Sequence, residues 1–144
     1  MSKIILDTNI FVAAILSPDG TCRRILRHVL SGDTYPIMGD ALYYEYEDVL
    51  DRDELFRDCA IDREEREDLF AAFLVCCDWV KVYYKWRPNL RDEGDNHLIE
   101  LAVAGGVTEI VTRNVKDLKS GELYFEHLRI LTPDEYLKEE GWER

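Results

Sequence analysis

Acidic and amide side chains follow two apolar runs of the chain at the point where each run ends. Ile4–Leu6 is followed by Asp7, and Ile110–Val111 is followed shortly by Asn114. Short apolar runs without alternation are typical of strands inside a parallel sheet, because helices cover both faces of such a sheet. Reactive groups in these folds gather beyond the carboxyl ends of the strands. Asp7 therefore has two open roles: a residue of a functional site, or the N-terminal cap of the next helix.

Two more carboxylates lie in or next to predicted helices and share the apolar side of each helix. Glu45 stands three residues after Leu42 and four before Val49, which places it on their inward side. Asp95 precedes an apolar helical pattern, and its alternative role is to cap that helix. His97 matches no metal-binding spacing, so we interpret it as a surface or near-site residue rather than a ligand.

An inward cluster of Asp7, Glu45 and Asp95 needs a compensating positive charge. The pattern provides no matching inward cation, so desolvation and like-charge repulsion would cost several kcal/mol. A divalent cation removes this cost, and oxygen ligands favour Mg²⁺ or Mn²⁺ over zinc. Mg²⁺ held by carboxylates and waters typically serves phosphate chemistry, in which metal-activated water hydrolyses a phosphodiester bond.

Five segments are predicted as strands, and helical patterns separate them. The strands are expected at 4–6, 35–38, 79–84, 109–112 and 128–131, with the second weakened by Pro36. Helices are expected at 22–30 behind a Thr21 cap, at 40–50, from near Asp62, after Gly94, and from a capping box at Thr132. Strands that alternate with helices indicate an α/β fold with a parallel sheet and right-handed crossovers.

The composition is that of one globular domain over residues 1–144. The chain has 47% hydrophobic and 33% charged residues, and no apolar stretch approaches the roughly 18–20 residues of a membrane span. The first strand follows the N-terminus directly, and the four cysteines show no Cys-x-x-Cys spacing. We therefore expect a cytoplasmic protein without a signal peptide.

The net charge of −12 argues against general adhesion to nucleic acid, which relies on a basic surface. Residues 45–68 hold 12 acidic and 4 basic residues, and their simplest role is a solvated surface. Two groups of basic residues are still candidates for contacting a phosphate backbone. The group nearer the N-terminus also fits a strand edge whose long side chains cover apolar surface. The two groups are Lys85, Arg87 and Arg91, and Arg113 with Lys116.

Four segments resemble, in the same order, the motifs of PIN-domain ribonucleases. They are Ile5–Phe11, Glu45 with Val49-Leu50, Asp92–Ala102, and Val111–Leu118. The resemblance spans nearly the whole chain and implies a three-layer α/β/α fold with a five-stranded parallel sheet, a Mg²⁺ or Mn²⁺ site and RNA cleavage. It is nearest to VapC-like toxins of toxin–antitoxin pairs, which implies an RNA substrate, a cognate antitoxin protein and a homodimer.

The resemblance also implies roles for individual residues. Asp7, Glu45 and Asp95 match the core acidic triad of the family, and the fourth acidic position falls on Asn114. Asn114 still offers a carbonyl oxygen for catalysis, and Asp117 is close enough in sequence to serve as the further metal ligand. Asn9 and Thr112 match positions whose residues orient the groups of the site. Asp92 matches a position farther out, from which it would orient the site only indirectly.

Two other functions compete with a nuclease. A haloacid-dehalogenase-like phosphatase also begins with a strand and an Asp, but it needs a second acid two residues later, where this chain has Asn9. A non-catalytic module that binds RNA or a partner protein is favoured by the charge of −12 and by Asn114. Retention of the three carboxylates opposes such a module, because a fold without metal gains stability by losing them.

Overall fold

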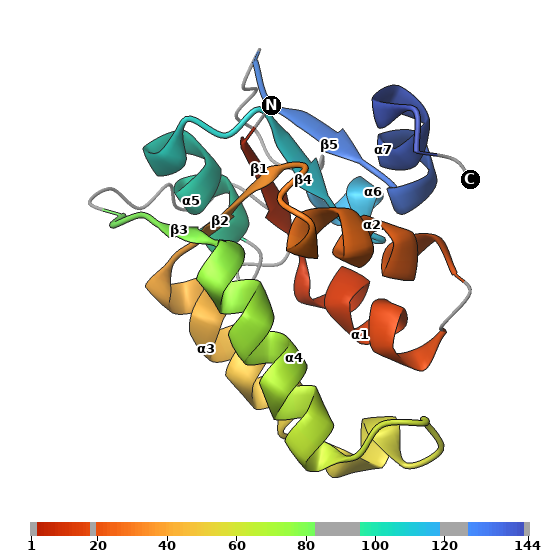
Figure 1. The fold of residues 1–144 in the computed structure, drawn as a ribbon. Coiled ribbons are helices and arrows are strands. Elements are labelled where there is room, and N and C mark those ends of the chain that lie inside the picture. Colours follow the sequence, from red (N-terminus) through yellow and green to blue (C-terminus); the bar gives the residue numbers. More distant parts are fainter. Residues whose placement is uncertain (1–2, 18–19, 83–95, 119–126, 143–144) are drawn as a thin grey trace.

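A computed structural model describes residues 3–17, 20–82, 96–118 and 127–142 (Figure 1). Five parallel strands form one sheet in the order β3-β2-β1-β4-β5, which confirms the predicted α/β fold. The strands are β1 Lys3–Leu6, β2 Tyr35–Met38, β3 Asp78–Trp79, β4 Glu109–Val111 and β5 Arg129–Leu131.

The central strand β1 is buried and is paired on both sides. Ile4 and Ile5 have no exposed surface, as expected for a strand that helices cover on both faces. β1 pairs with β4 up to the register Leu6↔Val111, so the two strands end at the same level. Asp7 and Thr112 follow these paired ends and therefore become neighbours at the carboxyl edge of the sheet.

Helices pack around the sheet (Figure 1). α2 lies beside α1, α4 and α7, whereas α5 packs on β1 and β4. α3 and α4 run side by side and extend away from the sheet, with the short 3-10 helix η1 (Asp53–Phe56) near their tip. In the described ranges no helix combines the length and apolar character needed to cross a membrane. The helices are α1 Thr8–Leu16, α2 Thr21–Leu30, α3 Asp40–Leu50, α4 Arg63–Cys76, α5 Asn96–Gly105, α6 Val115–Leu118 and α7 Pro133–Glu140.

An aromatic cluster joins α1, α3 and α4. The ring of Phe11 contacts those of Tyr46, Phe70 and Phe73, at centroid distances of 5.6, 5.9 and 5.2 Å. The Tyr46 hydroxyl also donates a hydrogen bond of 2.7 Å to the carbonyl oxygen of Leu6. Because Leu6 is the last residue of β1, this bond holds α3 against the end of the central strand.

Local sequence signals explain where two helices begin. The helix starts predicted at Asp62 and Thr132 are confirmed, and each has a capping box with the Glu three residues later. The prediction for Thr21 is wrong: Gly20 occupies the cap position, and Thr21 is the first helical residue. The Thr21 hydroxyl instead donates a hydrogen bond of 2.9 Å to Asp134 Oδ1, so a tertiary contact takes the place of the cap.

The second predicted strand is confirmed at Tyr35–Met38, whereas the third is much shorter than predicted. The third, predicted over 79–84, is only Asp78–Trp79; residues 80–82 are not in a strand, and 83–84 lie outside the described residues. Both residues of β3 are exposed, so the alternation of polar and apolar residues in this segment does not correspond to a buried and an exposed face. Pro36 lies in β2 between β1 and β3 instead of at an edge. Its missing N–H removes at most one ladder bond, which burial of Pro36–Met38 outweighs.

Candidate active site

Asp7 uses its two carboxylate oxygens differently. Oδ1 accepts a hydrogen bond of 2.8 Å from the backbone N–H of Thr8 and so caps α1. Oδ2 accepts hydrogen bonds from Thr112 Oγ1 at 2.8 Å and from Asn9 Nδ2 at 3.2 Å. The cap and the contacts toward β4 involve different oxygens, so capping does not exclude Asp7 from a functional site.

The environment of Asp7 disfavours its negative charge. Burial raises the pKa of the Asp7 carboxyl above its ordinary value of 3.8, and the hydrogen bond from Thr112 opposes this rise. The negative charge of Glu45 raises the pKa of Asp7 further, whereas His97 acts in the opposite direction. The ionised carboxylate therefore carries a desolvation and repulsion penalty that its hydrogen bonds do not fully offset.

Thr112 connects Asp7 to the chain segment after β4. It has no exposed surface, and its hydroxyl donates to Asp7 while accepting a hydrogen bond of 3.0 Å from the backbone N–H of Asn114. Asn9 Oδ1 accepts a hydrogen bond of 3.2 Å from the backbone N–H of Arg113. Asn9 and Thr112 thus lie beside Asp7 and attach residues 113–114 to the same edge of the sheet.

Glu45 and His97 meet next to Asp7. The bond between Tyr46 and β1 brings α3 to the carboxyl edge of the sheet, and Glu45 is the preceding residue of this helix. His97 Nε2, from α5, lies 3.2 Å from Glu45 Oε2. Glu45 Oε2 and His97 Nδ1 are buried, and neither forms a hydrogen bond within the described part of the chain. Two of the three predicted triad carboxylates, Asp7 and Glu45, therefore lie within electrostatic reach of each other.

His97 is the residue whose importance the sequence pattern underestimated. Its side chain is 15% exposed and contacts a predicted site carboxylate, so it is near the site and not on the open surface. The available signal was helical spacing: His97 stands four residues before Leu101, which is 2% exposed on the buried side of α5.

The other predicted site residues are exposed or lie outside what the structure describes. Asn114, Arg113 and Lys116 are exposed after β4. Asp117 belongs to α6, and its side chain is not among those described. Within the described residues, no group of three His, Cys, Asp or Glu side chains could hold a metal ion. The predicted site residues outside the described ranges are Lys85, Arg87, Arg91, Asp92 and Asp95.

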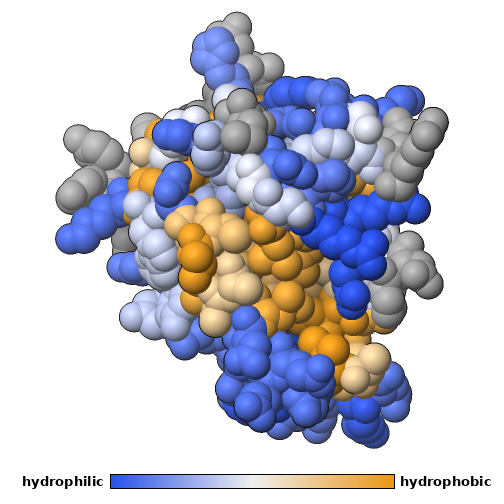
Figure 2. Space-filling view, viewed as in Figure 1, coloured by the Kyte–Doolittle hydropathy of each residue, from blue (hydrophilic) through white to orange (hydrophobic). Residues whose placement is uncertain are grey.

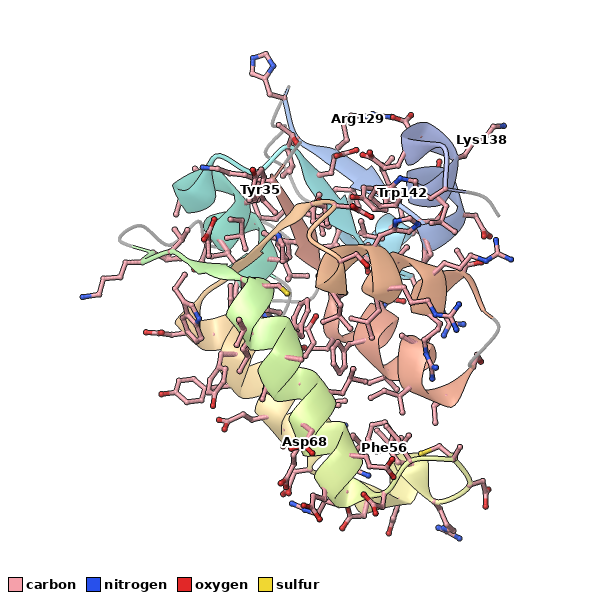
Figure 3. All side chains as sticks on the ribbon, viewed as in Figure 1. Tyr35, Phe56, Asp68, Arg129, Lys138 and Trp142 are labelled. Carbon is pink, nitrogen blue, oxygen red and sulfur yellow. The ribbon has the colours of Figure 1, made fainter. Side chains whose placement is uncertain are left out.

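Pockets lie in two places on the described surface. The smaller, of about 240 Å³, includes His97 in its lining but neither Asp7 nor Glu45. The larger, of about 610 Å³, lies between α3 and α4 and contains no predicted site residue. Its lining includes Arg66, which is 4% exposed and donates hydrogen bonds to Asp53 Oδ1 at 2.6 Å and to Leu50 O at 3.1 Å. The Arg66 guanidinium also lies over the ring of Phe56, which Figure 3 labels near the lower end of α4. Arg66 is therefore a structural residue of the α3–α4 hairpin.

Comparisons with known proteins agree with this fold. A chain in the crystal structure of VapBC2 from Rickettsia felis, bound to a DNA fragment from their promoter, superposes with a TM-score of 0.60 at 15% sequence identity. The match covers 90% of this chain and 98% of that chain. No curated protein matches the chain in sequence. A family model for the PIN domain matches residues 3–116, most of the chain, which therefore belongs to the PIN domain family.

Proposed function

We propose that this protein is a Mg²⁺- or Mn²⁺-dependent endoribonuclease that hydrolyses RNA phosphodiester bonds. The observation that carries the proposal is that the charge of Glu45, on α3, acts on Asp7 at the end of β1, so that two carboxylates from different elements lie near the carboxyl edge of the sheet. The pKa of Asp7 is raised by burial and by Glu45, and Glu45 Oε2 is buried without a hydrogen bond among the described residues. Carboxylate oxygens whose negative charge lacks a positive partner are suitable ligands for a divalent cation.

The residues that would hold the cation are Asp7, Glu45, Asp95 and Asp117, with Asn114 as a further oxygen donor in the catalytic set. When bound, the cation would supply the polarised phosphate and activated water of a metal-dependent hydrolase. The chain itself contributes orientation: Thr112 and Asn9 hold Oδ2 of Asp7, and the exposed Arg113 and Lys116 follow the same strand end.

We also propose that the nuclease is the toxin of a type II toxin–antitoxin pair, acting in the cytoplasm as a homodimer. The structural similarity to a chain of VapBC2 supports this assignment. Figure 2 shows an apolar area over α1 and α4, and these helices expose Leu16 and Val75, which are 43% and 86% exposed. Exposed apolar surface of this kind is typical of protein interaction sites, so it is available for an antitoxin.

A cleavage assay tests the enzymatic proposal. Purified protein should cut single-stranded RNA with Mn²⁺ or Mg²⁺ and should be inactive in EDTA. Asp7→Asn should abolish cleavage, because it removes a ligand charge while keeping an oxygen that caps α1. Asp48→Asn is the matched control, since Asp48 is exposed on α3 and should leave cleavage unchanged. Cleavage that persists in Asp7→Asn would contradict the assignment and indicate a contaminating nuclease.

A non-catalytic module that binds RNA or a partner protein is the second candidate. The net charge of −12 and the amide of Asn114 in the fourth acidic position favour it. This function predicts binding of RNA or an antitoxin without any cation-dependent cleavage, and with equal affinity for wild type and Asp7→Asn.

A further inference from the structure

The contact between His97 and Glu45 is the feature of the acidic edge that the proposed triad does not explain. His97 stands in the first turn of α5 and Glu45 in the middle of α3, so the contact is made between two separate helices. Nε2 of the imidazole lies 3.2 Å from Glu45 Oε2, within ion-pair distance, and that oxygen forms no hydrogen bond within the described residues. Among the described residues, the imidazole is therefore the polar group best placed to hold this carboxylate.

Without such a contact, Glu45 has a reason to leave the site. Asp7 and Glu45 repel each other when both are ionised. The Glu45 side chain is 35% exposed, so water is directly accessible to it. Rotation toward solvent would relieve the repulsion and hydrate the carboxylate. An attractive partner on the inward side is therefore required to keep the carboxylate near Asp7.

We propose that His97 is a positioning residue that holds the Glu45 carboxylate toward Asp7 and thereby prepares the acidic edge for a divalent cation. This inference rests on the proposed function. Groups that bond to a ligand carboxylate orient it, and their loss typically weakens metal affinity by roughly 10- to 100-fold. A carboxylate has two oxygens with two lone pairs each, so the imidazole contact leaves donors for the cation.

Three substitutions separate positioning from simple space filling. His97→Gln places an amide N–H close to the position of Nε2 and should retain most of the affinity. His97→Asn places its amide near the position of Nδ1, too short to reach Glu45, and His97→Leu has no donor. His28→Leu is the matched control, because His28 pairs with Asp33 through Nδ1 at 2.7 Å at a place remote from the acidic edge.

The test is a titration of each folded variant with Mn²⁺ alone, followed by the electron paramagnetic resonance signal of the free ion at one fixed pH. His97→Leu and His97→Asn should bind Mn²⁺ roughly 10- to 100-fold more weakly than wild type, whereas His97→Gln should bind nearly as tightly as wild type. His28→Leu should bind like wild type. Circular dichroism melting checks that every variant is folded.

The outcomes distinguish this inference from the proposed function. Wild-type affinity in His97→Leu, together with lost affinity in Asp7→Asn, would overturn the positioning role and leave the nuclease proposal standing. Equal weakening in His97→Gln, His97→Asn and His97→Leu would show that the amide does not replace the imidazole contact, which also overturns it. Absence of Mn²⁺ binding by the wild-type protein would overturn both.

Discussion

Replacing Glu45 by Gln should change the melting temperature in opposite directions with and without a divalent cation. The substitution keeps the size of the side chain and removes one of two neighbouring negative charges. The amide oxygen can take the place of the buried Oε2, and the amide nitrogen can face water, because the side chain is 35% exposed. No hydrogen bond to Oε2 within the described residues is lost.

The size of the effect without cation follows from the repulsion between Glu45 and Asp7. Glu45 raises the pKa of Asp7, so the two negative charges repel each other in the folded protein. Where water reaches the charges, repulsion between like unit charges is on the order of 1 kcal/mol. Solvent reaches the half-buried Glu45, so we expect a gain in unfolding free energy of about 1 kcal/mol. At roughly 2–4 °C per kcal/mol for a chain near this length, the metal-free variant should melt about 3 °C higher than wild type.

The effect with cation has the opposite sign. At a concentration of about 100 times Kd, a bound cation stabilises the native state by about 2.7 kcal/mol. Glu45→Gln should lose most of this stabilisation, so in Mn²⁺ the variant should melt about 5 °C below wild type. Differential scanning calorimetry at one fixed pH, with and without Mn²⁺, measures both differences. A variant less stable than wild type in EDTA, or an equal response of both proteins to Mn²⁺, would refute the reasoning. The control is Glu47→Gln, because Glu47 is exposed on the same helix. The difference in melting temperature between this variant and wild type should be the same in EDTA and in Mn²⁺.

Three further outcomes are expected. Arg66→Ala should destabilise the fold by about 2 kcal/mol in urea titrations, because it removes a buried hydrogen bond and a stacked guanidinium. The hydrogen bond from Arg66 lowers the pKa of Asp53 below its ordinary value of 3.8. The ionised Asp53 carboxylate therefore stabilises the fold above pH 3.8, and this stabilisation is lost as the pH falls through the lowered pKa. The difference in unfolding free energy between wild type and Asp53→Asn should vanish over the same pH range. Reversing Arg113 and Lys116 to Glu should weaken RNA binding by Asp7→Asn protein and flatten the salt slope of log affinity by roughly 0.7 per lost phosphate contact, whereas Arg57→Glu, exposed near η1, should leave both unchanged.

The fold class follows from patterns that are local in the sequence. Apolar runs such as Ile4–Leu6 and the helical spacing between them predict strands that alternate with helices, and alternation indicates a parallel sheet. Capping residues act within one turn, which is why the starts at Asp62 and Thr132 are predictable. The position of Asp7 after a buried strand is readable for the same reason, since it depends only on its immediate neighbours.

Contacts between distant segments were decided by the tertiary structure. Thr112 reaches Asp7 because β1 and β4 are paired up to Leu6↔Val111, a register that no local pattern specifies. The Tyr46 hydroxyl reaches the end of β1 through the packing of α3, and this places Glu45. His97 meets Glu45 only because α3 and α5 are neighbours in the fold.

The same distinction explains the errors. Thr21 has the chemistry of a cap, but its position beside Asp134 of α7 gives the hydroxyl a different partner. The third strand ends at Trp79 instead of Tyr84, because pairing with β2 involves only Asp78 and Trp79 within the described residues. Sequence patterns report what a residue can do with its neighbours in the chain. Which of these possibilities is realised depends on strand register and helix packing, because these bring together groups that are far apart in sequence.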